Sequence, residues 1–183
     1  MQRIPALATA AAPALSQPML EAVGKKLGMV PNLFKTFAHS PAVLQYYLAG
    51  SEALGNGVLS GALREQIALA TAGANECDYC ASAHTLMGKG AGLAAAEMSN
   101  NLRGQSSSAK TQAALDFAKA IVNSRGQVSD AQLQAVRAAG YGDAEVVEIV
   151  AVVAANIFTN YFNHIAGTVI DFPVVRSTAQ AHA

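Results

Sequence analysis

Cysteine is scarce in this sequence: the only two, Cys77 and Cys80, stand three positions apart. A small secreted protein held together by disulfide bonds normally has more cysteines at wider spacing, so that class is excluded. In a reducing compartment, a close pair of this kind indicates either redox chemistry or metal binding. The scarcity of cysteine therefore directs attention to one short segment of the chain.

The sequence also lacks an excess of charge of either sign. Twelve basic and twelve acidic residues cancel, only 13% of the 183 residues are charged, and Lys and Arg form no cluster. Binding of nucleic acid, or of an anionic membrane surface, normally requires a basic cluster, so we expect neither partner. The apolar share of 52% instead predicts a well-filled interior and some surface buried between subunits.

Neither a membrane span nor a signal peptide is predicted. The longest apolar stretch, residues 149–170, contains three asparagines and a histidine, which are costly in lipid. Residues 1–18 superficially resemble a signal peptide, but prolines interrupt their weakly hydrophobic, Ala-rich run. We therefore expect an extended N-terminal arm and a soluble, cytoplasmic protein.

Patterns typical of β-strands are nearly missing, because no alternating runs of β-branched residues are bounded by hairpin turns. Helix start and stop signals are frequent instead, among them serine caps, prolines at first positions and glycines after last turns. The expected helices cover 19–27, a short segment from 31, 41–54, a segment from 60 that breaks at 73–75, 77–89, 109–123, 129–140 and 143–169. The predicted fold class is all-α.

These helices predict one all-helical domain that spans residues 1–183 and has two halves. An N-terminal arm covers 1–18, and the first half, which contains the cysteines, covers 19–101. The second half covers 109–172, and a tail covers 174–183. The polar, Ser-rich segment RGQSSSAKT forms the loop between the halves. We expect the tail to be disordered.

The two halves contain similar segments. EQIALATAGANECDYC, which begins at Glu65, resembles EIVAVVAANIFTNYFN, which begins at Glu148. An alignment on these two glutamates places Asn160 and Asn163 opposite the two cysteines. The similarity indicates an internal helical repeat, although Ala-rich helices also resemble one another by chance.

The most informative stretch places a glutamate, Glu65, eleven residues ahead of the pattern C-x-x-C-x-x-x-H. On a helix advancing ~100° per residue, Cys77 and His84 fall on nearly the same stripe and Cys80 lies ~60° away. His84 also follows Cys80 by one helical turn, so their side chains can meet. A break at 73–75 would allow Glu65 to fold back against these three groups.

This combination of residue types fits the reduction of a peroxide. The reaction requires a thiolate, which the first turn of a helix favours through its free N–H groups and dipole. An imidazole can accept the proton, and a carboxylate can hold the ring or relay protons. A second cysteine three residues away can capture the sulfenic acid as a disulfide before overoxidation.

Longer segments carry a resemblance to a known group of proteins. LREQIALATAGANECDYCASAHTLMGKGAGL is similar to the core of the alkyl hydroperoxidase D and carboxymuconolactone decarboxylase superfamily. MVPNLFKTFAHSPAVL and FTNYFNHIAGTVIDFP resemble its peroxidase-related branch, and the similarity extends over residues 3–173. The resemblance implies an all-helical bundle of the alkyl hydroperoxidase D type, with an internal repeat, assembled as a homo-oligomer.

The resemblance also implies roles for individual residues. Cys80 would be the thiolate that attacks the hydroperoxide, Cys77 its resolving partner, and His84 with Glu65 the proton relay. Tyr79 stands where the best-known members have a histidine, so the role of that position does not carry over. The decarboxylases of the superfamily lack the cysteine pair, which favours the redox branch. No bound cofactor is required, but a dithiol reductant, protein or small thiol, must restore the cysteines.

Other interpretations stay open. Two cysteines, a histidine and a carboxylate could complete a zinc site in a metal-binding or redox-sensing protein with little turnover, but a second Cys/His pair is missing. A cofactor-free decarboxylase of the same fold is a third interpretation. Covalent haem attachment is excluded, because Ala81 rather than a histidine follows Cys80.

A weaker set of polar residues surrounds this centre. Asn156, Asn160 and Asn163 are spaced four and three apart on one face of the last long helix, with His164 beside that face. They could form interhelical hydrogen bonds, or Asn160, Asn163 and His164 could line the far wall of the thiol pocket. Tyr79 is interpreted as a pocket wall or packing residue.

Overall fold

The computed structural model describes residues 2–178, and in this part of the chain every regular element is helical. A short 3₁₀ helix, η1 (Thr9–Ala11), precedes the helices α1 (Gln17–Leu27), α2 (Asn32–Phe37), α3 (Pro41–Gly55), α4 (Gly61–Ala74), α5 (Asp78–Gly90), α6 (Ala95–Leu102), α7 (Ala109–Ser124), α8 (Asp130–Ala138) and α9 (Asp143–Ala166). The predicted all-α class is confirmed.

Local capping chemistry explains most helix boundaries. Serine side chains accept hydrogen bonds from backbone N–H groups in the first turns of α3, α4, α7 and α8, through Ser40, Ser60, Ser108 and Ser129. The predicted capping box with Gln132 is present at α8. Gly28 and Gly167 adopt positive φ angles of 74° and 59° and end α1 and α9.

Several predicted boundaries are wrong in detail. Pro31 precedes α2 rather than opening it. Asp143 is the first residue of α9 and not its cap; the cap position belongs to Gly142, whose N–H donates to Glu145 at 2.8 Å. Helix α9 ends before Gly167 instead of reaching residue 169.

Helix α6 is absent from the predicted set, and its packing explains a glycine. A Cβ atom on Gly73 would lie 1.9 Å from the carbonyl oxygen of Leu102, so only glycine allows α4 and α6 to approach so closely. Helix α4 therefore continues through Gly73 to Ala74, and the predicted break lies one to two residues later, at Asn75 and Glu76.

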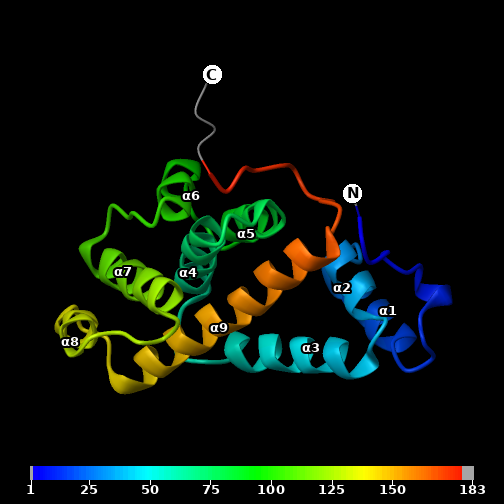
Figure 1. Ribbon diagram of the computed structural model, residues 1–183, viewed down its shortest axis with the longest axis horizontal. Coiled ribbons are helices and arrows are strands. Elements are labelled where there is room, and N and C mark those ends of the chain that lie inside the picture. Colours follow the sequence, from blue (N-terminus) through cyan, green and yellow to red (C-terminus); the bar gives the residue numbers. More distant parts are fainter. Residues whose placement is uncertain (1, 179–183) are drawn as a thin grey trace.

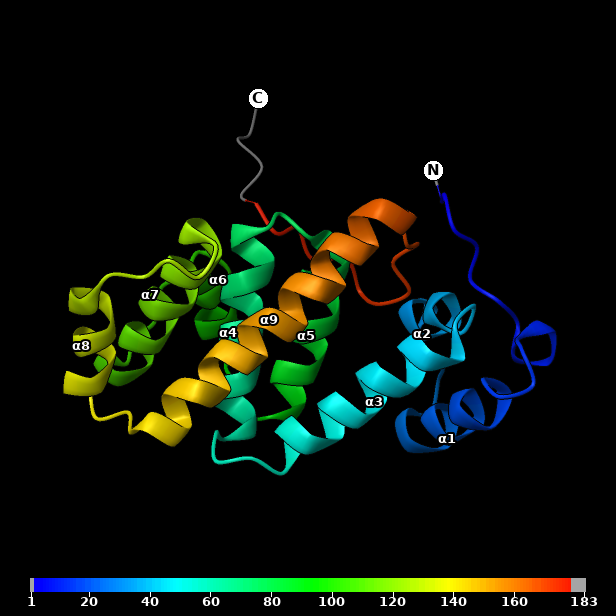
Figure 2. The same ribbon diagram turned by 60° about the horizontal axis from the view of Figure 1, so that its bottom comes forward.

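Helix α9 crosses the molecule diagonally and contacts most of the other helices (Figure 1). It packs against α4, α7 and α8 at one end and against α3 and α5 farther along. Figure 2 shows α1 and α2 gathered at the end of α3 that is remote from α7 and α8. The N-terminal arm is tied to the end of α9, since the N–H groups of Arg3 and Ile4 donate to the Ala166 carbonyl at 2.7 and 3.1 Å.

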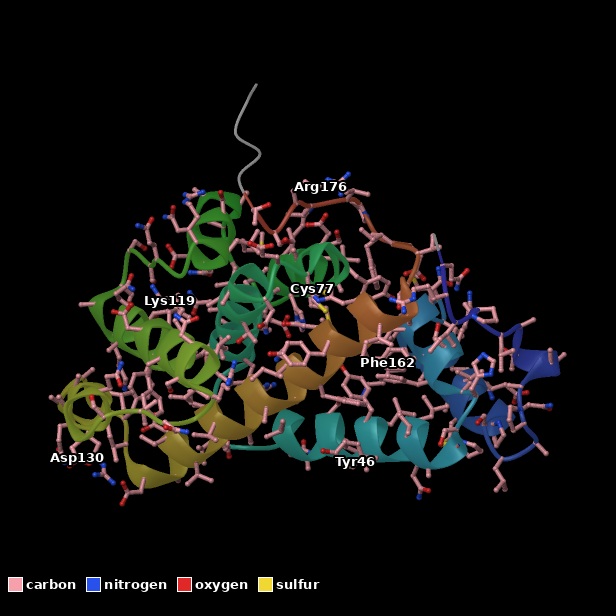
Figure 3. The ribbon with its side chains drawn as sticks, viewed as in Figure 1. Tyr46, Cys77, Lys119, Asp130, Phe162 and Arg176 are labelled. Carbon is pink, nitrogen blue, oxygen red and sulfur yellow. The ribbon has the colours of Figure 1, made fainter. Side chains whose placement is uncertain are left out.

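The interior consists of two apolar clusters. The first lies between α4, α7, α8 and α9 and includes Ile67, Leu115, Ile149 and Val153. The second joins α1, α2, α3 and α5 to the segment after α9, and it contains both cysteines. Figure 3 shows Cys77 between α5 and α9, on the side toward Phe162. The predicted chemistry therefore sits inside an apolar cluster and not on an exposed surface.

The aligned segments at Glu65 and Glu148 differ in local structure. The first is divided between α4 and α5, whereas the second is part of the unbroken helix α9. The left-handed residue Glu76, with a φ of 55°, interrupts the first segment, and the second has no counterpart to this turn.

Helix α9 has 24 residues and contains an 18-residue stretch with a mean hydropathy of 1.4, so by length and composition it could cross a membrane. Its inward stripe of Asn156, Thr159, Asn160 and Asn163 is buried against other helices. A buried polar stripe of this kind is typical of a core helix with a functional face.

Candidate active site

The turn between α4 and α5 places the cysteines at the start of a helix. Asn75 ends α4, Glu76 takes a left-handed backbone conformation, and Cys77 occupies the cap position before α5. The N–H of Cys77 donates to the Ala72 carbonyl at 2.9 Å, which fixes the turn. Cys80 therefore lies in the first turn of α5, where the helix dipole favours a thiolate.

Both cysteines are buried, with 1% and 2% of their surfaces exposed, but they have different neighbours. The Nδ2 atom of Asn163 donates to the Cys80 sulfur at 3.2 Å, and the Cys80 sulfur lies 3.9 Å from the Thr159 hydroxyl. Cys77 hydrogen-bonds to Cys80 and lies near the Asp78 carboxylate. One donor from α9, Asn163, thus reaches Cys80, and the Thr159 hydroxyl accepts from the Cys80 thiol.

The hydrogen bond between the two thiols separates their acidities. It is the largest cause that lowers the pKa of Cys80, and it outweighs burial, which acts in the opposite direction. The positive charge on His84 lowers this pKa further, to about 6. The same hydrogen bond, followed by burial, raises the pKa of Cys77 above its ordinary value. These surroundings therefore favour ionisation of Cys80 over ionisation of Cys77.

His84 and Glu65 form the predicted acid–base pair. The Nδ1 atom of His84 lies 2.8 Å from Oε2 of Glu65, and their side chains are only 14% and 19% exposed. Burial would lower the pKa of His84, but the Glu65 carboxylate outweighs burial and raises it. A hydrogen bond with Asn156 acts in the same direction as Glu65. The pair thus favours an imidazolium close to the Cys80 thiolate.

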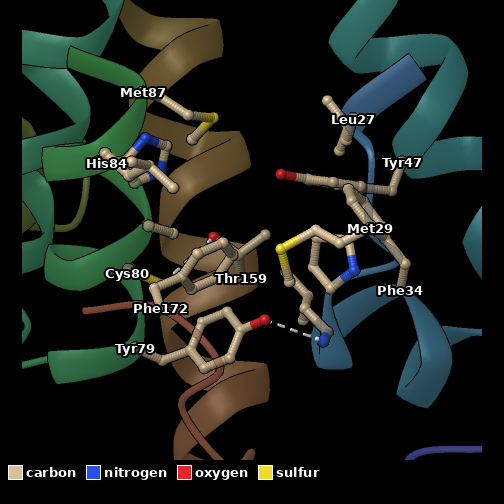
Figure 4. Close-up of a pocket in the computed structure, with 14 residues that line it drawn as sticks. Leu27, Met29, Phe34, Tyr47, Tyr79, Cys80, His84, Met87, Thr159 and Phe172 are labelled. Carbon is tan, nitrogen blue, oxygen red and sulfur yellow. Dashed lines mark hydrogen bonds between the residues drawn. The ribbon is translucent and has the colours of Figure 1, made fainter. Parts of the chain in front are cut away.

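A cavity of about 190 Å³ opens beside Cys80. Figure 4 shows α5 and α9 on one side of it, and the end of α1 with α2 and α3 on the other. Its lining is mostly apolar and consists of Leu27, Met29, Pro31, Leu33, Phe34, Tyr47, Tyr79, Cys80, Ala83, His84, Leu86, Met87, Thr159 and Phe172. The cavity exposes Cys80 and His84 to a small molecule, whereas Cys77 lies behind them.

Tyr79 closes the lower part of the cavity and joins three segments. Its hydroxyl accepts a hydrogen bond from the N–H of Leu33 at 3.0 Å (Figure 4). The same hydroxyl donates to Oδ1 of Asp171, also at 3.0 Å. Oδ2 of Asp171 accepts from the N–H of Asn32 at 2.7 Å. Burial raises the pKa of Tyr79 well above its ordinary value. This arrangement agrees with a packing role at the pocket wall.

The segment after α9 is held against the start of α5. Oδ1 of Asp78 accepts from both the N–H and the hydroxyl of Ser177 at 2.8 Å, and its Oδ2 binds Arg176 at 2.6 Å. The N–H of Val175 donates to the Ser82 hydroxyl at 2.9 Å. Residues 174–178 are thus ordered, contrary to the predicted disordered tail; residues 179–183 of that tail lie outside the described chain.

The weaker predicted residues are placed differently from one another. Asn160 and Asn163 adjoin Cys80 from α9 but do not form part of the cavity lining. The prediction for His164 is wrong: it is exposed, and its Nε2 lies 3.3 Å from the carbonyl of Glu76, outside the cavity. Its position on α9 directs it to the turn before Cys77.

Sequence reasoning missed two contributors from distant parts of the chain. Tyr47 reaches from α3 into the cavity, with its hydroxyl directed toward α5 and α9 (Figure 4). Burial, followed by the Cys80 charge, raises the pKa of Tyr47 to about 12, so its hydroxyl stays protonated. Phe172 covers the cavity from the segment after α9. Tyr47 belongs to none of the motifs, and Phe172 lies in the segment FTNYFNHIAGTVIDFP but at no spacing that indicates a place in the cavity.

The zinc interpretation lacks a donor set in the described part of the chain. Residues 2–178 contain no group of three or more His, Cys, Asp or Glu side chains placed to hold one metal ion. Glu65 is bound to His84, and Cys77 is bound to Cys80. The four groups are arranged as two interacting pairs.

Comparisons with known proteins agree with this geometry. The model of the carboxymuconolactone decarboxylase family matches residues 41–123. A peroxidase-related protein from Ralstonia eutropha JMP134, described as an alkylhydroperoxidase AhpD core, is 30% identical, with a TM-score of 0.82 over 93% of this chain and 92% of the other. A peroxidase-related protein from Silicibacter sp. TM1040 is 26% identical, with a TM-score of 0.81 over 92% of each chain.

A debrominase shares the fold at lower identity. The structure of Bmp8 in complex with 2,3,4-tribromopyrrole is 21% identical and has a TM-score of 0.77 over 93% of this chain and 92% of the other. No curated protein sequence matches the chain.

Proposed function

Because the chain belongs to the carboxymuconolactone decarboxylase family, in its peroxidase-related, alkylhydroperoxidase D-like branch, we propose that it reduces organic hydroperoxides with Cys80 and Cys77. One observation carries the proposal. Cys80, the thiol with the lowered pKa, lines the cavity beside His84, and Cys77 contacts it from behind. A nucleophile, an acid–base pair and a resolving thiol are thus arranged in the order in which the reaction needs them.

In the first step, the Cys80 thiolate attacks the outer oxygen of the hydroperoxide. The O–O bond breaks, a hydroxyl group stays on the sulfur as a sulfenic acid, and an alkoxide leaves. The imidazolium of His84 gives its proton to the alkoxide, which departs as an alcohol. Glu65 holds the ring in place and stabilises the imidazolium before this transfer.

In the second step, the sulfur of Cys77 attacks the sulfur of the Cys80 sulfenic acid. A disulfide forms, and hydroxide leaves as water with the proton of the Cys77 thiol. The hydrogen bond to an ionised Cys80 is the main cause of the raised pKa of Cys77. Oxidation of Cys80 removes that negative charge, so Cys77 becomes easier to ionise only when it is needed.

The cavity supports an organic substrate and not hydrogen peroxide alone. Its volume of about 190 Å³ exceeds the ~150 Å³ of a cavity that holds benzene. Methionine, leucine and phenylalanine side chains form most of its wall, and such side chains adapt to irregular apolar groups. A compact alkyl or aryl hydroperoxide matches this combination of size and polarity.

The cycle requires a reductant and has consequences for assembly and location. A dithiol, either protein or small molecule, must reduce the disulfide by exchange. We include a homo-oligomer in the proposal, because the apolar side chains of Leu27, Met29, Leu86 and Met87 are exposed at the cavity. We also include a cytoplasmic location, where two reduced cysteines would persist.

The experiment that tests the proposal compares turnover of cumene hydroperoxide and hydrogen peroxide with dithiothreitol as the reductant. We expect a higher kcat/KM for cumene hydroperoxide and no turnover in Cys80→Ser. Leu33→Trp, which fills the cavity, should lower kcat/KM for cumene hydroperoxide more than for hydrogen peroxide. A lyase activity that survives replacement of both cysteines would instead support a decarboxylase.

A second candidate is the reductive removal of bromine from an aromatic ring. A debrominase of the same fold binds a brominated pyrrole, and the aromatic and methionine walls of this cavity suit a flat ring of that size. Two thiols would supply the electrons: the carbon–bromine bond is replaced by carbon–hydrogen, bromide leaves, and the cysteines become a disulfide. Release of bromide from 2,3,4-tribromopyrrole, dependent on Cys80 and faster than peroxide turnover, would favour this candidate.

A further inference from the structure

One face of α9 carries four polar side chains that follow the reacting groups of α5. Asn156, Thr159, Asn160 and Asn163 are spaced at helical intervals, and each is at least nine-tenths buried. Asn156 hydrogen-bonds to His84, while Thr159 and Asn163 contact the sulfur of Cys80. Thr159 also lines the cavity, whereas Asn160 and Asn163 do not.

The carboxamides of Asn163 and Asn160 both lie beside Cys80 on the buried face of α9. Nδ2 of Asn163 donates to Sγ of Cys80 at 3.2 Å. Oδ1 of Asn160 accepts from Nδ2 of Asn75 at 2.9 Å, which fixes the rotation of the amide. The buried Nδ2 of Asn160 has no hydrogen-bond partner among the described residues, so it is available as a donor, and Asn160 acts to lower the pKa of Cys80.

The charge balance of the site explains why neutral donors are needed there. The Glu65 carboxylate and the His84 imidazolium neutralise each other, so a Cys80 thiolate adds one uncompensated negative charge to an apolar cluster. A buried charge must be stabilised by hydrogen bonds or it does not form. Amide N–H groups held by a rigid helix provide this stabilisation without adding a charge of their own.

We propose that the Asn163 and Asn160 carboxamides form a thiolate-binding site that keeps Cys80 ionised and selects it, rather than Cys77, as the nucleophile. The selection has a second component on the other sulfur. Cys77 lies near the Asp78 carboxylate, which opposes its ionisation. An amide donor therefore contacts the sulfur of Cys80, whereas a nearby carboxylate opposes a charge on Cys77. The inference rests on the proposed role of Cys80 as the attacking thiolate.

The test measures thiol ionisation directly and needs no peroxide. In a Cys77→Ser background, absorbance at 240 nm is followed against pH, so that only Cys80 titrates. Asn163→Leu keeps the approximate volume of the side chain but removes the donor, and Asn163→Asp keeps the shape but replaces the donor with a carboxylate. We expect the midpoint to rise by about one pH unit in the leucine variant, a tenfold loss of thiolate below the midpoint, and further in the aspartate variant.

Two further variants separate this role from a structural one. Asn101→Asp changes another fully buried asparagine, which donates to Glu97 and Gln105 and lies outside the site. It should lower the melting temperature without moving the midpoint. If Asn163→Asp does not fold, Asn160→Leu must still raise the midpoint.

Midpoints in Asn163→Leu and Asn160→Leu that coincide with the Cys77→Ser reference would overturn the inference. A midpoint that rises in Asn163→Leu, and rises further in Asn163→Asp, would support the inference even if the protein turned over no hydroperoxide. The failure of this inference and the failure of the proposed function are therefore distinguishable.

Discussion

Nδ1 of His84 and Oε2 of Glu65 are 2.8 Å apart, although 19 residues and a helix break separate them in the sequence. The turn at Asn75 and Glu76 reverses the chain, so that α5 packs against α4 and the two side chains meet. The carboxylate raises the pKa of His84 against the effect of burial. The imidazolium of His84, held by Glu65 beside Cys80, connects the fold to the proposed chemistry.

Replacing Glu65 with glutamine should lower the pKa of His84, because burial, the largest single influence on it, would no longer be opposed by the carboxylate. We expect peroxide turnover to fall on the order of 10²-fold, as for the loss of an acid–base partner. Proton NMR titration of the His84 ring measures the first effect. Asp116→Asn, in the exposed pair with Lys119, is the matched control and should change neither quantity.

The hydrogen bond between the two thiols predicts a difference between two variants of Cys77. Cys77→Ser retains a donor to Cys80, whereas Cys77→Ala removes it, and this bond is the largest cause of the lowered pKa of Cys80. The pH midpoint for alkylation by iodoacetamide should therefore be about one unit lower in the serine variant. Equal midpoints would show that the bond does not control the acidity of Cys80.

The same shift predicts how the stability of the reduced protein depends on pH. The pKa of Cys80 is lower in the folded protein than in the unfolded chain, so ionisation stabilises the fold. This contribution is fully present above the ordinary thiol pKa near 8.5 and is lost as the pH falls through about 6. Denaturant unfolding measures the free energy of unfolding of the reduced protein and of Cys80→Ala. The difference between these two free energies should grow as the pH rises from about 6 to 8.5.

Tyr79→Phe should affect stability more than chemistry. The change leaves the N–H of Leu33 and Oδ1 of Asp171 without their shared partner, so we expect a loss of about 1–3 kcal/mol in the free energy of unfolding. Turnover at a temperature well below the melting point should stay within about threefold. Tyr46→Phe, at an exposed position, is the control. A large loss of turnover in Tyr79→Phe with unchanged stability would instead identify Tyr79 as a proton donor.

Glu97 predicts an effect on stability that is independent of the active site. Hydrogen bonds from Ser106, opposed by burial and assisted by Ser107, lower the pKa of its carboxyl to about 2. Glu97→Gln should destabilise the fold on the order of 1 kcal/mol at pH 7, because the partly exposed position limits the effect. This contribution is present above the ordinary carboxyl pKa and is lost as the pH falls through about 2. Thermal unfolding against pH measures it, and Glu52→Gln should show no such difference.

Local patterns predicted the fold well because helix boundaries depend on nearby residues. Serine caps, the capping box at Ser129 and the glycines after α1 and α9 act over one turn of chain. Helix α6 has no such signal, since Ala94 precedes it and provides no side-chain cap. Its position depends on the close contact with Gly73, which periodicity cannot reveal.

The site was predictable to the extent that it lies on α4 and α5. Helical spacing and the break between these helices brought Glu65, His84 and Cys80 together in the prediction, as in the structure. For the asparagines of α9, the sequence left two alternatives open: hydrogen bonds between helices, or a wall of the thiol pocket. An asparagine face on a helix is compatible with both. His164 was predicted wrongly, since the exact rotation of α9 directs it to Glu76 rather than into the cavity. Tyr47 and Phe172 reach the cavity through tertiary packing alone.

The most direct test of the central claim is a single turnover of the reduced, metal-free protein with cumene hydroperoxide. The wild type should consume one equivalent and form the Cys77–Cys80 disulfide, and Cys77→Ser should consume one equivalent and stop at a sulfenic acid that dimedone traps on Cys80. Cys80→Ser should consume none. Peroxide consumption by Cys80→Ser at the wild-type rate, or dimedone labelling at Cys77 in that variant, would contradict the account.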